Sequence, residues 1–192
     1  MTTTISFLYF PLIVVLILVS EPLILILLSE KWSHSIVLFQ LLLLSIFFSP
    51  LYSININSLN ANGDSNLTFK LEIVKKILIS LSIVGLFSFG IEIMLVGLIA
   101  ANTISYFYSM AYIKKVFMHY FKQQFTDISQ GFLISLVIGV MVFSLNYFVA
   151  SLHIRFILQL ISAVLLFVVL FWHLQGEMYG RLKLFLLQKV IR

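Results

Sequence analysis

One charge-free stretch decides the fold of this chain: residues 32–63, which read WSHSIVLFQLLLLSIFFSPLYSININSLNANG. A membrane-spanning helix needs about 20 mostly apolar residues to cross a hydrocarbon core of about 30 Å. Residues 36–59 of the stretch meet that requirement, and Asn60 to Asn66 follow them with the composition of a loop. The stretch therefore predicts a helix that crosses a lipid bilayer.

The same length requirement identifies six segments along the whole chain. They cover about 5–28, 36–59, 71–90, 93–113, 129–151 and 155–172. Short connections at Gly90 and around His153 predict antiparallel neighbours. The sequence thus indicates an all-α integral membrane protein with about six transmembrane helices. A basic tail, 173–192, has apolar residues near helical spacing and is expected to lie on the cytoplasmic leaflet as an interfacial helix.

The composition agrees with a membrane protein. Of 192 residues, 61% are hydrophobic and 10% are charged, whereas a soluble domain has roughly 45–50% apolar and about 25% charged residues. The basic residues behind the net charge of +5 lie between apolar runs, so they indicate contact with membrane lipids and argue against nucleic acid. The four histidines fall at different membrane ends and there is no cysteine. We therefore expect neither an enzyme nor a metal site or cofactor.

The distribution of basic residues predicts the orientation in the membrane, because basic loops stay in the cytoplasm. Ten of the twelve fall on one side: Lys70, Lys75, Lys76, Lys114, Lys115, Lys122, Arg181, Lys183, Lys189 and Arg192. Lys31 and Arg155 fall on the other. Both termini are therefore predicted to be cytoplasmic.

The second span carries a polar stripe. Ser45, Ser49, Ser53 and Asn57 follow one another at a spacing of four, which places them on one face of a helix. The stripe either lines a wet cleft that binds sugar hydroxyls or consists of side chains bonded to their own helix. Pro50 removes one helical hydrogen bond within the stripe and predicts a kink.

The third span begins with charged residues. Only the 15 residues 77–91 are free of charge before Glu92, which at about 1.5 Å per residue is too short for the hydrocarbon core. Lys75 and Lys76 are therefore expected near the inner headgroup level. They either extend to lipid phosphates, paired with Glu72, or turn inward and bind an anionic headgroup such as a diphosphate.

Glu21 lies within the first span, next to Pro22. A carboxylate at that depth is a candidate for ion coupling, or a polar residue at a helix break that caps the following segment.

Two other spans carry small residues at a spacing of four, which allows close approach of helices. These residues are Gly97, Ala101, Ser105 and Ser109 in one span and Gly131, Ser135 and Gly139 in another. We interpret both stripes as helix-packing surfaces.

Several of these motifs together resemble the later helices of bacterial polysaccharide flippases, a family of the multidrug/oligosaccharidyl-lipid/polysaccharide exporter superfamily. The motifs are Glu21-Pro22-Leu23-Ile24, Leu27 to Trp32, Phe48-Ser49-Pro50-Leu51, Asn55, Asn57, Gly63 and Leu71 to Lys76. Asp64 departs from the pattern, because the family often has a basic residue after the loop glycine. That departure argues against a phosphate contact from this loop.

The resemblance implies a chain of the bacterial cell inner membrane that acts in polysaccharide or lipopolysaccharide biosynthesis. Family members form two helical lobes around a central cavity and export undecaprenyl-diphosphate-linked oligosaccharide by alternating access. This chain would be a C-terminal part, inactive without a missing N-terminal half or a complementary chain. The substrate-binding residues would be Lys75, Lys76, Ser49, Ser53 and Asn57. The alternative is a membrane scaffold or assembly subunit, or a degenerate truncated product, without transport activity.

Overall fold

The computed structural model describes residues 2–116, 118–149 and 151–169. The basic tail expected at 173–192 and the end of the sixth predicted span lie outside the described residues. The helices are α1 (Thr2–Leu28), α2 (Ser35–Ser45), α3 (Ser49–Ala61), α4 (Ser65–Leu86), α5 (Ile91–Val116) and α6 (Met118–Phe148), followed by a last helix, Leu152–Val169. Short 3-10 turns lie at Glu30–Trp32 and Phe87–Phe89. The described chain contains no strand, so the all-α prediction is confirmed.

Five helical segments are long and apolar enough to cross a membrane. They are Ile5–Leu28, Ser35–Ala61, Ile91–Lys114, Ile128–Phe148 and Leu152–Val169. The third predicted span, 71–90, is not among them, because α4 carries four charged residues within its first twelve. This helix also ends earlier than predicted, at Leu86, where the 3-10 turn leads to Gly90. Gly90 has a φ of 104°, a conformation that glycine adopts without strain.

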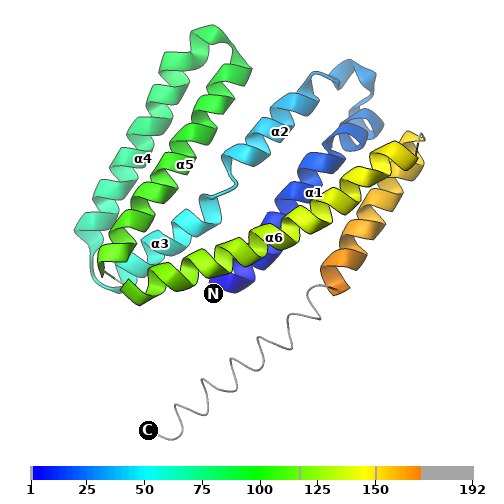
Figure 1. Ribbon diagram of the computed structural model, residues 1–192. Coiled ribbons are helices and arrows are strands. Elements are labelled where there is room, and N and C mark those ends of the chain that lie inside the picture. Colours follow the sequence, from blue (N-terminus) through cyan, green and yellow to red (C-terminus); the bar gives the residue numbers. More distant parts are fainter. Residues whose placement is uncertain (1, 117, 150, 170–192) are drawn as a thin grey trace, which may run out of the picture.

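The helices form two packed groups that α2 and α3 connect (Figure 1). The antiparallel pair α4 and α5 forms one group, and α1 packed along α6 forms the other. The last helix adds Ala163 to a small core shared with α1 and α6. Segment α2 contacts α1 and α5, whereas α3 contacts α5, α4 and α1. Helix α3 thus lies between the two groups.

The second predicted span is interrupted in its middle. Helix α2 ends at Ser45 and α3 begins at Ser49 with Pro50 in its first turn. Because proline has no N–H, the Ile46 carbonyl lacks the usual donor four residues later. It accepts instead from the Ser49 amide at 2.9 Å and from the Tyr9 hydroxyl of α1 at 3.0 Å. The predicted effect of Pro50 is confirmed, and it is a break rather than a bend.

An aromatic core surrounds this break. Its buried members are Phe10, Leu51, Tyr52, Tyr106 and Met110. The ring of Phe10 stacks on Phe47 with centroids 4.6 Å apart, and that of Tyr106 stacks on Phe48 at 5.0 Å. Each such pair contributes about 0.5–1.5 kcal/mol beyond the burial of its area. The two stacked pairs therefore hold the interrupted backbone in one conformation.

Both small-residue stripes lie at helix contacts, as the sequence predicts. A methyl group at Gly131 would lie 2.9 Å from the Ser6 carbonyl oxygen of α1, and Gly139 is equally close to Val14. In α5, Ser105 and Ser109 are fully buried. Small side chains at these positions let the helix backbones approach closely, which is how membrane helices associate.

Candidate functional site

The break in the second span divides the predicted polar stripe. Ser45 lies in α2, where it is buried and its hydroxyl donates to the Leu42 carbonyl at 2.7 Å. In α3, the Ser53 hydroxyl donates to the Ser49 carbonyl at 3.1 Å. Bonding to their own helix, one of the two alternatives for this stripe, therefore describes Ser45 and Ser53.

The α3 part of the stripe nevertheless forms one uncovered face. Ser53 and Asn57 are exposed, and Ser49 is half-buried. Asn60, one turn beyond Asn57, extends this face and was not among the predicted residues. The opposite face of α3 is the buried one, with Leu51, Tyr52, Asn55 and Leu59. We call Ser49, Ser53, Asn57 and Asn60 the α3 polar face.

The α3 polar face differs from the rest of the exposed surface. The other long helices expose many large apolar side chains, for example Leu81, Ile104 and Val140. Apolar surface suits contact with lipid tails, but polar groups in hydrocarbon are costly and in membrane proteins usually face a bundle interior or water. The α3 polar face is therefore a surface that water or another protein segment covers.

Asn55 anchors α3 from its buried side. Its side chain is fully buried, and Nδ2 donates to the Ser109 hydroxyl of α5 at 3.0 Å. The Ser109 hydroxyl in turn donates to the Tyr106 carbonyl at 2.7 Å. Asn55 is one of the residues on which the family resemblance rests. Its position in the sequence does not predict that Ser109 is its partner. The contact orients the polar face away from α5.

The two predicted lysines occupy different environments. Lys75 is half-buried, with Nζ 4.0 Å from the centroid of the Tyr52 ring in α3. Glu72, one turn earlier in α4, interacts electrostatically with both Lys75 and Tyr52. Lys76 is exposed on another side of α4. The structure thus brings only Lys75 to α3, where it contacts Tyr52.

Lys75 lies deeper in the bundle than the α3–α4 turn. It is ten residues into α4, which corresponds to about 15 Å along the helix. Its partner Tyr52 is nine residues before the end of α3, or about 14 Å. Along both helices, the Lys75–Tyr52 contact therefore lies at about the same distance from the α3–α4 turn.

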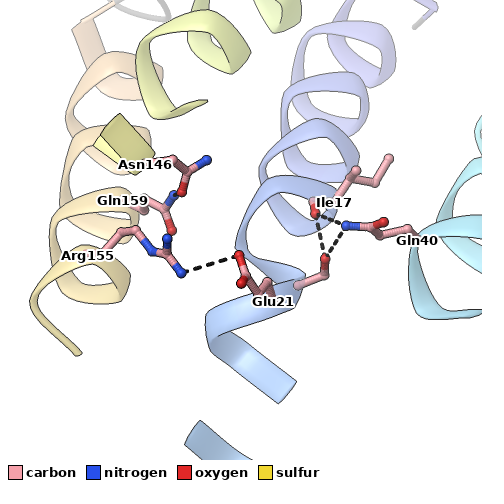
Figure 2. Close-up of polar contacts among 7 residues, drawn as sticks. Ile17, Glu21, Gln40, Asn146, Arg155 and Gln159 are labelled. Atoms are coloured by element: carbon pink, nitrogen blue, oxygen red, sulfur yellow. Dashed lines mark hydrogen bonds and ion pairs between the residues drawn. The ribbon is translucent and has the colours of Figure 1, made fainter. Parts of the chain in front are cut away.

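Glu21 belongs to a second polar cluster, shown in Figure 2. Its Oε2 lies 3.3 Å from Nη2 of Arg155 in the last helix. Gln159, one turn beyond Arg155, donates to the Asn146 side chain of α6 at 3.1 Å. On the other side of α1, Gln40 donates to the Ser20 hydroxyl at 2.8 Å. The sequence identified Glu21 as a coupling candidate but gave no sign of this ion pair.

The cluster links four helices, α1, α2, α6 and the last helix, at one end of the bundle. Half of the Glu21 side chain is exposed, at 51%, whereas only 14% of the Arg155 side chain is. Glu21 is seven residues from the end of α1, and Arg155 is three residues from the start of the last helix. The capping alternative for Glu21 is not observed, because α1 continues through Pro22 to Leu28.

The described residues contain no group of three His, Asp or Glu side chains that could bind a metal ion. With five apolar spans and no strand among the described elements, the chain is a multi-pass α-helical membrane protein in its architecture and composition. Comparison with protein-family models, curated proteins and solved structures gave no match. A more specific assignment therefore rests on the residues of the two polar sites.

Proposed function

We propose that this chain is the C-terminal part of a polysaccharide flippase. With a complementary lobe it would export undecaprenyl-diphosphate-linked oligosaccharide across the bacterial inner membrane by alternating access. The observation that carries this proposal is the α3 polar face, which lies uncovered in a protein whose other long helices expose many apolar side chains, while Lys75 contacts Tyr52 of the same helix. Hydroxyl and amide groups match the hydrogen-bonding needs of a sugar.

Lys75 is the residue we assign to the diphosphate of the lipid carrier. A lysine binds phosphate as a point charge and needs no fixed planar geometry. The Tyr52 ring and Glu72 place its ammonium group against α3 in the absence of substrate. A diphosphate beside α3 could compete with Glu72 for this charge. Lys76 extends toward lipid headgroups and serves as an anchor.

The break between α2 and α3 supports a transport role. Interrupted helices in transporters lie next to substrate cavities, because freed backbone groups need protein or water as partners. Here the break directly precedes the α3 polar face, so the polar face starts where the helix is interrupted. Glu21 remains the candidate for ion coupling, with Arg155 as its partner.

The resemblance implies that this chain forms only one lobe of the transporter, so we expect no export by this chain alone. A cavity that opens alternately to two sides needs a lobe on each side. We therefore propose a missing N-terminal half or a complementary chain as the partner, facing the α3 polar face.

Single cysteines test whether water reaches the α3 polar face, since the chain contains no native cysteine. Ser53→Cys should react with a membrane-impermeant maleimide in the complete flippase, whereas Ile104→Cys, at an exposed apolar position of α5, should not. Equal labelling of the two positions would contradict a wet cleft.

Complementation tests the function itself. The chain alone should restore no surface polysaccharide to a strain that lacks its flippase, and co-expression with an N-terminal half should restore it. Restoration by the chain alone would show that the fragment assignment is wrong.

A scaffold without transport activity is the second candidate. The observation that favours it is that two cavities of the described chain, both along α1, are lined almost entirely by apolar residues. A scaffold would use the α3 polar face to bind another membrane protein. Ser53→Cys would then be protected from the reagent by that partner.

A further inference from the structure

A groove of about 360 Å³ runs along the contact between α1 and α6. Its lining is almost wholly apolar: Val14, Leu18, Phe132, Ser135, Leu136, Gly139, Val140 and Phe143. Ser135 and Gly139 are buried and too small to fill the space between the larger side chains around them. Leu136, Val140 and Phe143 are exposed at the outer surface. The groove is therefore open to the surface that faces lipid tails.

Glu21, which pairs with Arg155, lies one turn beyond the groove residue Leu18. Residues three apart share a face of a helix, so Glu21 follows Leu18 along α1. By the same spacing Asn146 follows Phe143 along α6. Glu21 is half exposed there, with Arg155 at 3.3 Å. The groove is apolar along its length and has a pair of opposite charges beyond one end. A lipid molecule has the same arrangement, with an apolar tail and a charged headgroup.

The charged end has unused hydrogen-bonding capacity. Nε of Arg155 and Oε1 of the fully buried Gln159 have no hydrogen-bond partner within the described chain. A buried donor and a buried acceptor left unpaired are costly, so a ligand or water that bonds them is favoured. Glu21 has a further carboxylate oxygen beyond the one that faces Arg155.

We propose that this site binds a phospholipid with a phosphoethanolamine headgroup, one acyl chain of which occupies the α1–α6 groove. The phosphate would lie at Arg155 and the ammonium group at Glu21, so that each charge of the headgroup meets its opposite. An anionic headgroup without an amine would satisfy Arg155 but would leave Glu21 repelled. A choline headgroup has the charge but no N–H to donate to a carboxylate. This inference does not depend on the flippase assignment.

Native mass spectrometry of the full chain in detergent tests the headgroup. The probes are phosphatidylethanolamine, phosphatidylglycerol and phosphatidylcholine with identical acyl chains. We expect the first to bind about tenfold more tightly than the other two, the factor that one charge-assisted hydrogen bond provides. Glu21→Gln should remove this preference. Arg155→Gln should weaken all three lipids, and a melting curve on the same sample shows whether that variant is folded.

The acyl-chain position is tested with two tryptophan variants of α6. Leu136→Trp fills the groove, whereas Met141→Trp lies on another side of the same helix; the parental side chains are exposed to 49% and 51%. Leu136→Trp should weaken all three lipids about tenfold relative to Met141→Trp.

Three outcomes would overturn the proposal. Equal affinities for the three lipids would show that the site does not distinguish their headgroups. Equal effects of the two tryptophan substitutions would show that the groove holds no acyl chain. A protein dimer that Leu136→Trp dissociates, with lipid binding unchanged, would assign the groove to a second copy of the chain.

Discussion

Replacement of Lys75 by glutamine in the complete transporter should slow export, whereas the same change at Lys76 should not. The two residues are adjacent, carry the same charge and lie on different sides of α4. Lys76→Gln is therefore a matched control for Lys75→Gln. Any effect of lost positive charge on insertion should be the same for both.

The magnitude follows from the contacts of Lys75. A hydrogen bond to a charged group contributes about 1.5–3 kcal/mol, so loss of one lysine–phosphate contact should slow export by about 10- to 100-fold at limiting carrier concentration. Loss of the contact with the Tyr52 ring adds a stability cost of about 0.5–1 kcal/mol. That cost should slightly lower the amount of transporter in the membrane without changing the export rate per transporter.

The assay is export of surface polysaccharide, normalised to the amount of transporter in the membrane. Lys75→Arg should keep most of the activity, because the charge is retained. Tyr52→Leu removes the ring and should reproduce part of the loss by releasing Lys75 from α3, whereas Tyr52→Phe should have little effect. Parental export by both Lys75→Gln and Lys76→Gln would refute the reasoning and make both lysines lipid anchors.

Three further predictions concern the fold and its place in the membrane. Gly131→Ala should lower the free energy of unfolding by about 1–3 kcal/mol, because its methyl group meets the α1 backbone; Gly85→Ala, in open space, should not lower the melting temperature. Reporter fusions after Gly90 should be active outside the cell and those after Lys122 inside; the opposite pattern would reverse the predicted orientation. Deletion of residues 177–192 should leave membrane insertion intact, and recovery of the shortened chain in the soluble fraction would refute an interfacial role for the tail.

The contact of Asn55 with Ser109 shows how a buried residue supports the candidate site. Both side chains are fully buried, and they join α3 to α5 across 54 residues of sequence. Removal of either side chain breaks a buried hydrogen bond, and such a bond contributes about 0.5–1.5 kcal/mol. The orientation of the α3 polar face therefore depends on a contact made from its opposite side.

The sequence by itself determined the features that depend on local spacing. The length of apolar runs predicted the all-α membrane architecture, and the missing N–H of Pro50 predicted a kink in the second span, where the structure has a break. The spacing of Gly131 and Gly139 predicted helix packing. Each of these follows from helix geometry and from the chemistry of residues within a few turns of one another.

Only the tertiary structure decided which polar residues meet. Glu21 and Arg155 are 134 residues apart, and no local pattern connects them. Adjacent lysines differ because α3 lies against one side of α4, which brings Lys75 alone to Tyr52. Helical periodicity gives the face on which a residue lies, but the neighbour that covers this face depends on how the helices pack. For that reason the sequence identified Lys75, Lys76 and Glu21 as candidates, and the fold assigned partners to Lys75 and Glu21.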